Sequence, residues 1–245
     1  MKIFLFTSNK YANILPDQAN LFNKYTGNNF QVDVLGFQKP QKKLPKNYNF
    51  ISMGKQEDFP EKNWADPIRS FIEETKENYF CLFWDDLFPV KKMNYDKFKS
   101  AENLVKKSIV QKVCLDKGTD KQYLGATIFD EDFMEMNQTA DYRSTLKPSI
   151  WNKEYFLKHL GKSYDPWQFE VINQEKMKND NARILICRNE PIMEFFNVFV
   201  KGKFHEVNLK RSEGDYSRRH GWHRWSVIPD EDIKIYEKYR RLKEV

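Results

Sequence analysis

Two adjacent acids end the most apolar stretch of the chain. The stretch "YFCLFWDDLF" places Asp85 and Asp86 directly after six apolar or aromatic residues. Burial and mutual repulsion both oppose ionisation of such a pair, so a partner of opposite charge would stabilise it. A divalent cation such as Mn²⁺ or Mg²⁺ that also holds a diphosphate is one such partner. In the alternative interpretation, one aspartate caps a turn and the other is solvated.

The elements around this pair predict an α/β domain. The apolar run before the acids shows no polar alternation, which is typical of a strand covered on both faces. Three further strands are expected at residues 2–7, 30–37 and 49–54, and helices at 16–27, 64–76 and 94–108. Alternating strands and helices indicate layers of helices on a sheet. In open sheets of this class, ligands bind outside the carboxyl ends of the strands, where the acidic pair lies.

The second half of the chain is less regular. Helical spacing predicts a short helix that carries Trp151 in the core. A further helix is expected to begin at Pro166 with Asp165 as its N-cap. The ranges expected here are a strand running into a helix at 127–136, the two helices at 148–160 and 165–177, and strands at 182–189 and 194–204. We expect one domain over residues 1–204, with residues 205–245 as a basic aromatic extension packed on or covering it.

Composition sets broad limits on the function. The 245 residues, 40% of them hydrophobic, suffice for one large domain. No apolar run approaches the roughly 20 residues that span a bilayer, and the amino terminus is expected to form a strand rather than a signal peptide. Three cysteines without close spacing favour a reducing, cytoplasmic location. The net charge of +6 permits an anionic partner without requiring one.

Two long segments resemble one enzyme family. Residues 63–98 and 142–170, together with "VFVKGKF", are similar to GT-A-like glycosyltransferases of bacterial and phage surface-carbohydrate loci. In that family a helix leads into an apolar strand ending in Asp-Asp, and a Ser-Leu-x-Pro-x-Ile-Trp element precedes Ser-x-Trp-x-Phe-Glu. The resemblance runs from Met1 to Phe204 and implies a GT-A-like, Rossmann-like mixed sheet flanked by helices. GT-A enzymes usually carry Asp-x-Asp, whereas side chains one apart on a strand point to opposite faces.

The resemblance implies transfer of a sugar from a nucleotide-sugar donor to an acceptor hydroxyl. Asp85 and Asp86 would hold the divalent cation that stabilises the leaving diphosphate, which makes Asp86 part of the catalytic machinery. Glu170 would take the proton from the acceptor hydroxyl. The alternative for Glu170 is an ion pair with a lysine, or stabilisation by the helix amino terminus alone.

The remaining expected contacts concern the nucleotide and the sugar. Thr7, Ser8 and Asn9, in the loop after the first strand, would bind the nucleotide, unless they only form a turn. Trp167 would stack on a sugar ring, with a tryptophan that contacts no ligand as the alternative. Arg143 would contact phosphate, with a plain surface arginine as the alternative.

The carboxyl-terminal segment is basic and aromatic between Lys201 and Trp225. It is open to interpretation as a solvated surface, a lid over the donor, a polynucleotide surface or a contact with an anionic membrane. His220 and His223 have a zinc-like spacing but lack further ligands nearby. We expect a surface glycan precursor as acceptor. The alternatives are a phage enzyme that glycosylates a hydroxylated DNA base, a non-enzymatic nucleic-acid-binding protein, and a metal-dependent phosphoesterase, which normally needs more clustered acids and histidines.

Overall fold

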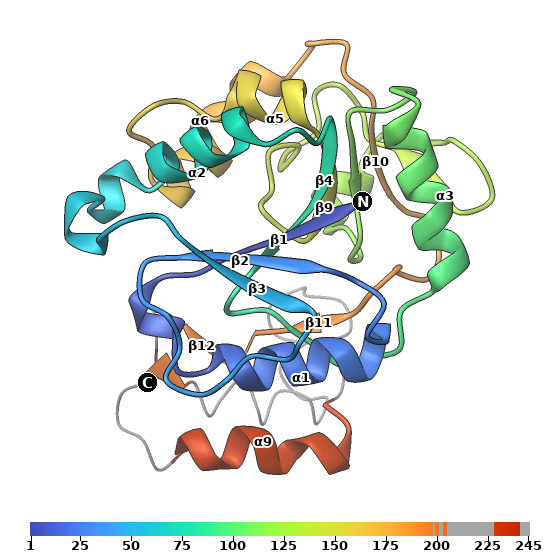
Figure 1. Ribbon diagram of the computed structural model, residues 1–245. Coiled ribbons are helices and arrows are strands. Elements are labelled where there is room, and N and C mark those ends of the chain that lie inside the picture. Colours follow the sequence, from blue (N-terminus) through green and yellow to red (C-terminus); the bar gives the residue numbers. More distant parts are fainter. Residues whose placement is uncertain (198, 201–202, 205–227, 241–245) are drawn as a thin grey trace.

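A nine-stranded mixed sheet forms the centre of the protein in this computed structural model (Figure 1). The structure describes residues 1–197, 199–200, 203–204 and 228–240. The strand order is β3-β2-β1-β4-β9-β6-β10-β8-β7. The strands are β1 (Lys2–Phe6), β2 (Val32–Gly36), β3 (Tyr48–Ser52), β4 (Tyr79–Trp84), β6 (Lys112–Cys114), β7 (Thr127–Ile128), β8 (Phe133–Glu135), β9 (Ser149–Asn152) and β10 (Ile184–Cys187).

Six strands point the same way and end at one edge of the sheet. β1 is parallel to β2 and β4, β2 is parallel to β3, and β6 is parallel to β10. β9 runs antiparallel to both β4 and β6, which makes β6 parallel to β4. The chain leaves β1 toward β2 on one side and returns to β4 on the other. The carboxyl ends of β1 and β4 therefore form the topological switch point of the sheet, which is the usual ligand position in such sheets and is called the crevice here.

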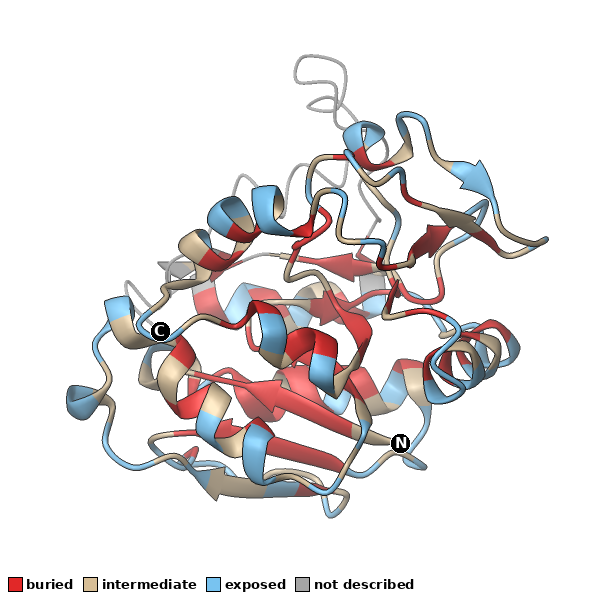
Figure 2. Ribbon diagram, turned by 90° about the horizontal axis from the view of Figure 1, so that it is seen from above, coloured by how far each residue is buried: buried red, intermediate tan, exposed pale blue. Residues whose placement is uncertain are grey.

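Helices cover both faces of the sheet, and the strands between them are buried (Figure 2). On one face, α1 (Leu15–Thr26) and α3 (Tyr95–Lys106) pack their apolar sides on the sheet. On the other face lie α2 (Ala65–Glu74), α5 (Lys153–His159) and α6 (Pro166–Met177), with the short α4 (Asp120–Tyr123) at the periphery. The mixed α/β fold with a single domain is therefore confirmed.

Local sequence signals explain where the helices that matter begin and end. α6 begins with Pro166 at its first position and a capping box between Asp165 and Gln168, because each satisfies a backbone N–H that the helix leaves open. α1 ends before Gly27, whose φ of 77° suits a residue without a side chain. Both boundaries agree with the sequence predictions.

The last described helix, α9 (Asp230–Arg240), packs on α1. Lys24 Nζ lies 2.7 Å from Asp232 Oδ1, and the Tyr25 hydroxyl also donates to Asp232. Two small ribbons lie near this helix pair, one of β5 (Phe88–Pro89) with β11 (Phe195–Phe196) and one of β12 (Phe199–Val200) with β13 (Lys203–Phe204). Within the described residues, every helix is too short or too polar to cross a membrane.

Two sequence predictions are wrong in the second half. Residues 127–136 form the strands β7 and β8 rather than a strand and a helix. Residues 148–160 contain β9 before α5, so Trp151 sits on a strand instead of a helix. Pairing of β9 with two neighbours overrides the helical spacing, since tertiary contacts outweigh local propensity. Trp151 is nevertheless fully buried in the core, as expected.

Candidate active site

The acidic pair lies in the turn that follows β4, at the crevice between β4 and β1. Asp85 Oδ2 accepts a hydrogen bond of 3.0 Å from the backbone N–H of Ser8. The buried side chain of Gln18 holds the turn from beneath, because its Nε2 donates to the carbonyls of Trp84 (3.3 Å) and Leu87 (3.1 Å). α1 and the loop after β1 therefore fix the backbone that carries both acids.

The two carboxylates point to different neighbours. Asp85 faces the loop after β1, whereas Asp86 Oδ2 accepts a 2.9 Å hydrogen bond from Asn197 Nδ2. Asn197 Oδ1 in turn accepts from the backbone N–H of Phe199 at 3.0 Å. β11, which precedes Asn197, pairs with β5, directly after the acids. The segment after β11 thus positions Asp86 separately from Asp85.

Both acids are held in surroundings that disfavour their charge. Burial and then the charge of Asp86 raise the pKa of Asp85 well above its usual range, although the Ser8 N–H opposes this. Burial likewise raises the pKa of Asp86 to about 6, and the charge of Glu170 adds to the effect, while Asn197 opposes it. A bound cation would reverse these shifts. A positive charge beside the pair would therefore favour the ionised form of both carboxylates.

Glu170 is brought to the same region from α6. Its Oε1 accepts from the backbone N–H of Leu146 at 2.6 Å and from the Thr145 hydroxyl at 3.4 Å. The Ser144 hydroxyl donates to the backbone carbonyl of Glu170 at 2.5 Å. The donors on this carboxylate are thus an amide and a hydroxyl rather than a lysine. It lies close enough to Asp86 for its charge to act there.

Aromatic rings border this region. The Trp84 ring, at the end of β4, lies 5.3 Å from that of Trp64, and its indole N–H donates to the Leu146 carbonyl. Leu146 therefore links Trp84 to Glu170. Trp167 is 71% exposed and precedes Glu170 by three residues, so the two side chains are neighbours along α6. Contact of Trp167 with a sugar stays a prediction.

The loop after β1 lies where the sequence analysis placed it. Thr7 is buried and Ser8 binds Asp85 through its amide. The backbone N–H of Asn9 donates to Gln56 Oε1 at 2.6 Å, which ties this loop to the one after β3. Asn9 Oδ1 is buried and meets no hydrogen-bond donor in the part of the chain that the structure describes. Nucleotide binding by these residues stays a prediction.

Arg143 occupies a different place from the one expected. It is completely buried, and its guanidinium donates to the carbonyls of Met136, Asn137, Met177 and Ala182 and to the side chains of Gln138 and Asp180. Its donors are consumed by the protein itself because these carbonyls would otherwise be buried unpaired. Both the phosphate contact and the surface arginine are therefore corrected to a structural role.

A cation at the acidic pair would have one or two carboxylates as protein ligands and would be held mainly by the phosphates of a bound substrate. No group of three or more acidic, histidine or cysteine side chains that could hold a metal occurs among the described residues. Asp85 accepts a hydrogen bond from the Ser8 amide and Asp86 accepts one from Asn197, and a metal at either carboxylate stays a prediction. Mg²⁺ is commonly bound through one or two carboxylates plus substrate phosphates, which is compatible with this arrangement.

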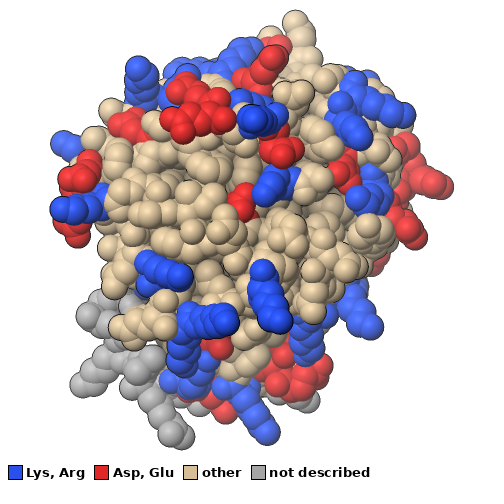
Figure 3. All heavy atoms as spheres, in the orientation of Figure 1, with Lys and Arg blue, Asp and Glu red and all other residues tan. Residues whose placement is uncertain are grey.

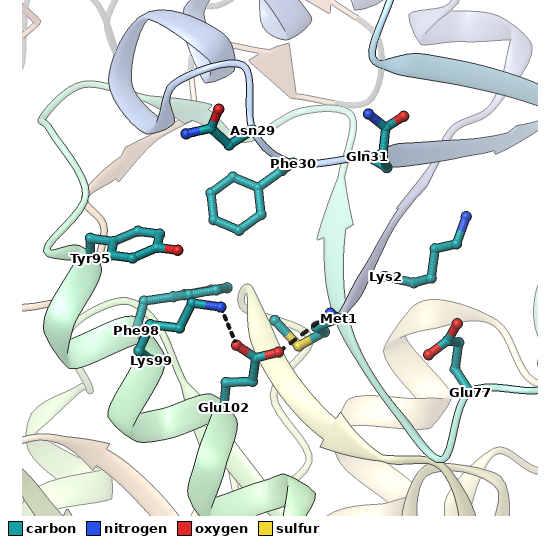
Figure 4. A pocket seen from close by; sticks show the side chains of 10 residues that line it. All are labelled: Met1, Lys2, Asn29, Phe30, Gln31, Glu77, Tyr95, Phe98, Lys99 and Glu102. Atoms are coloured by element: carbon teal, nitrogen blue, oxygen red, sulfur yellow. Dashed lines mark hydrogen bonds and ion pairs between the residues drawn. The ribbon is translucent and has the colours of Figure 1, made fainter.

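Two hollows lie at the opposite edge of the sheet, at the amino ends of the strands. One, of about 340 Å³, has Phe30, Tyr95, Lys99 and Glu102 in its wall (Figure 4). The other, of about 420 Å³, shares Gln31 with it. Basic and acidic side chains are interspersed over the coloured part of the face seen in Figure 3. Neither hollow contains a residue of the acidic pair or of its surroundings.

The sequence analysis missed Gln18, Gln56 and Asn197. Gln18 and Asn197 had a detectable signal, because each is a polar side chain within an apolar pattern, where a buried hydrogen-bond partner is expected. Most of the basic aromatic segment, residues 205–227, lies outside the described residues. The interpretations of that segment as a lid, a nucleic-acid surface or a membrane contact therefore stay predictions.

Comparison with known proteins shows the fold. No family model matches the chain, and neither does any curated protein sequence. Among solved structures, Staphylococcus aureus TarS 1–349 in complex with UDP-GlcNAc has a TM-score of 0.52 and 11% identity, covering 88% of this chain and 68% of that one. UDP-glucose pyrophosphorylase complexed with UDP-glucose has a TM-score of 0.50 and 9% identity, covering 87% and 99%.

A third match, TarS 1–349 without that ligand, has a TM-score of 0.49 and 11% identity and covers 78% of this chain. This chain spans 58% of the length of that TarS chain. At these identities the shared property is the fold.

Proposed function

We propose that this protein is a glycosyltransferase that uses a nucleotide-sugar donor. The observation that carries the proposal is the meeting of the β1 loop, the acidic pair and Glu170 at one crevice, with two carboxylates whose pKa values are raised. Support also comes from fold neighbours whose structures hold UDP-GlcNAc and UDP-glucose. Perturbed carboxylates in a crevice are typical of functional sites.

The donor diphosphate would lie beside Asp86. Asp86 would hold a divalent cation, Mn²⁺ or Mg²⁺, and the cation would supply the positive charge that stabilises the leaving diphosphate. Asp85 would keep the loop after β1 in place through the Ser8 amide. Thr7, Ser8 and Asn9 of that loop would bind the nucleotide.

Glu170 would act on the acceptor as general base. Its Oε1 accepts hydrogen bonds from the Leu146 amide and the Thr145 hydroxyl, which fixes the position of the carboxylate. The acceptor hydroxyl would give its proton to Glu170 as it attacks the anomeric carbon. Trp167, exposed three residues before Glu170, would contact the acceptor sugar.

The acceptor we propose is a surface glycan precursor, with the reaction taking place in the cytoplasm. An extended basic face would favour a DNA acceptor, and the face shown in Figure 3 carries acidic as well as basic side chains. The exposed ring of Trp167 beside a carboxylate suits a sugar acceptor better, because apolar sugar faces stack on aromatic rings while hydroxyls hydrogen bond to carboxylates.

A thermal-shift screen against nucleoside diphosphates and nucleotide sugars, with and without Mn²⁺, tests the proposal. A ligand that binds the native state raises the melting temperature by mass action, so a hit gives the donor class and the metal requirement together. Mass spectrometry of candidate acceptors, incubated with the donor that binds, would then detect transfer. Absence of any shift across the full set of common nucleotide sugars would refute the proposal.

A further inference from the structure

A short segment, residues 143–146, lies between α6 and the sheet. On its α6 side it supplies three donors to Glu170, namely the Leu146 amide and the Thr145 hydroxyl on the carboxylate and the Ser144 hydroxyl on the carbonyl. On its sheet side, Lys112 Nζ donates to the carbonyls of Arg143 at 3.1 Å and Thr145 at 2.7 Å. This segment, called here the 143–146 segment, is therefore clamped between a lysine and the carboxylate.

Lys112 is an unusual residue for the centre of a sheet. It lies on β6, has no exposed surface, and its ammonium sits 4.2 Å from the centre of the Trp151 ring. Within the described residues, its Nζ makes no ion pair with a carboxylate; its partners are two carbonyls and a ring. Burying a lone charge is costly, so its retention calls for a reason beyond packing.

Several neighbouring groups shift the pKa of Lys112, and Glu170 is one of them. Burial lowers the pKa of Lys112 to about 8, the charge of Arg143 lowers it further, and the charges of Cys114 and Glu170 oppose this. Glu170 is the carboxylate among them. The ammonium thus acts on Glu170 in two ways, through the electric field and through the carbonyls whose peptide units carry the donors to Glu170.

We propose that Lys112 is a positioning residue for Glu170. Its ammonium holds the carbonyls of the 143–146 segment toward the sheet, so that the Leu146 amide and the Thr145 hydroxyl point at the carboxylate. The inference rests on the proposed function only where it concerns turnover, because the placement of the 143–146 segment is a property of the folded chain. A base displaced by about 1 Å can lose roughly 100-fold in rate.

Lys97 offers a matched control. It is also a buried lysine, 4% exposed, that donates to a backbone carbonyl, that of Glu190 at 2.8 Å, and lies over a ring, that of Phe133 at 5.4 Å. It comes from α3 and contacts neither the 143–146 segment nor Glu170. Lys112→Met and Lys97→Met therefore each remove one buried ammonium that donates to a backbone carbonyl and lies over a ring. Lys97 differs in that its Nζ also lies 3.7 Å from Asp132 Oδ1.

The first measurement needs no activity. Amide hydrogen exchange at Leu146 reports on its hydrogen bond to Glu170. We expect exchange at this amide to rise at least about tenfold in Lys112→Met, relative to amides of β4 in the same sample, and to stay unchanged in Lys97→Met. Unchanged exchange at Leu146 in a folded Lys112→Met protein would overturn the inference, whether or not the protein transfers sugars.

The second measurement is steady-state turnover with the donor found by thermal shift. Lys112→Met should lower kcat by about 10- to 100-fold with the donor KM within about twofold, whereas Lys97→Met should keep wild-type kcat. Equal kcat in the two variants would overturn the inference. If Glu170→Gln leaves kcat intact, the general-base role fails instead, and the exchange measurement still decides the role of Lys112.

Discussion

The carboxylates at the two edges of the sheet have pKa values that are shifted in opposite directions. At the amino edge, Glu102 pairs with Lys99 at 2.8 Å. Burial alone would raise the pKa of Glu102, but Lys99 and the amino terminus outweigh it and lower that pKa. At the carboxyl edge, the pKa values of Asp85 and Asp86 are raised, and the groups that oppose this are neutral amides and hydroxyls.

We expect the ligand site at the edge with the raised carboxylate pKa values rather than at the edge with the hollows. The two hollows described above lie at the amino edge, where Lys99 pairs with Glu102. The carboxyl edge keeps two disfavoured charges, which reduce stability unless a ligand or cation compensates them. Sites that hold strained or unbalanced groups are commonly functional, because stability is given up there for chemistry.

The largest difference between the two edges is expected when one acid at each edge is replaced by its amide. Asp86→Asn should reduce transfer by about three orders of magnitude, since the charge that holds the cation and diphosphate is lost. Glu102→Gln should leave transfer at the wild-type level. Turnover of the two purified variants with the same donor and acceptor checks this, and comparable losses in both would contradict the contrast between the edges.

The same two variants should move stability in opposite directions. The folded pKa of Asp86 is raised to about 6, so its ionisation costs stability as pH rises from about 4 to 6, and Asp86→Asn should raise the melting temperature at pH 7. The pKa of Glu102 is lowered, so its charge contributes stability that is lost as pH falls, and Glu102→Gln should lower the melting temperature at pH 7. Calorimetry at pH 7 distinguishes the signs; a lower melting temperature for Asp86→Asn would be contrary to this account.

Glu170→Gln sharpens the roles within the carboxyl edge. Loss of the base should reduce kcat by about 10²- to 10⁴-fold while donor affinity stays within about twofold, because the proposed role of Glu170 is to take the proton of the acceptor rather than to bind the donor. Isothermal titration with the donor, alongside turnover, separates the two quantities. A parallel fall in donor affinity would make Glu170 a binding or structural residue.

A smaller effect is expected from pH. Lys112 has a pKa of about 8, so it carries its charge below that pH and loses it above. If the ammonium positions Glu170, kcat should decline several-fold between pH 7.5 and 9 in wild type, as estimated from one titrating group. Lys112→Met should be slower throughout and lack this decline. An identical alkaline decline in the variant would assign it to another group.

The smallest effect is expected at the surface. Trp167→Ala should raise the acceptor KM by about three- to tenfold and leave the melting temperature nearly unchanged, because the ring is 71% exposed. Val171→Ala, one turn further along α6 and 44% exposed, serves as the control. Equal acceptor KM values for the two variants and wild type would remove Trp167 from the acceptor site.

The sequence predicted the first half of the fold well, because its apolar runs and helix caps agree with the tertiary structure. The position of Asp85, Asp86 and the β1 loop at one edge of the sheet was also predictable, because all three follow apolar strands. The sequence prediction failed at Trp151, where pairing with two strands overrode helical spacing. It also failed at Arg143, because a charged residue buried among backbone carbonyls leaves no local pattern.

Crystal structures grown with the best-binding nucleoside diphosphate and Mn²⁺ test the central claim most directly. The account predicts density for the diphosphate and metal between Ser8 and Asp86, within bonding distance of the Asp86 carboxylate. Density in the hollow bordered by Tyr95 and Lys99, with the Asp86 carboxylate still bound only to Asn197, would contradict it.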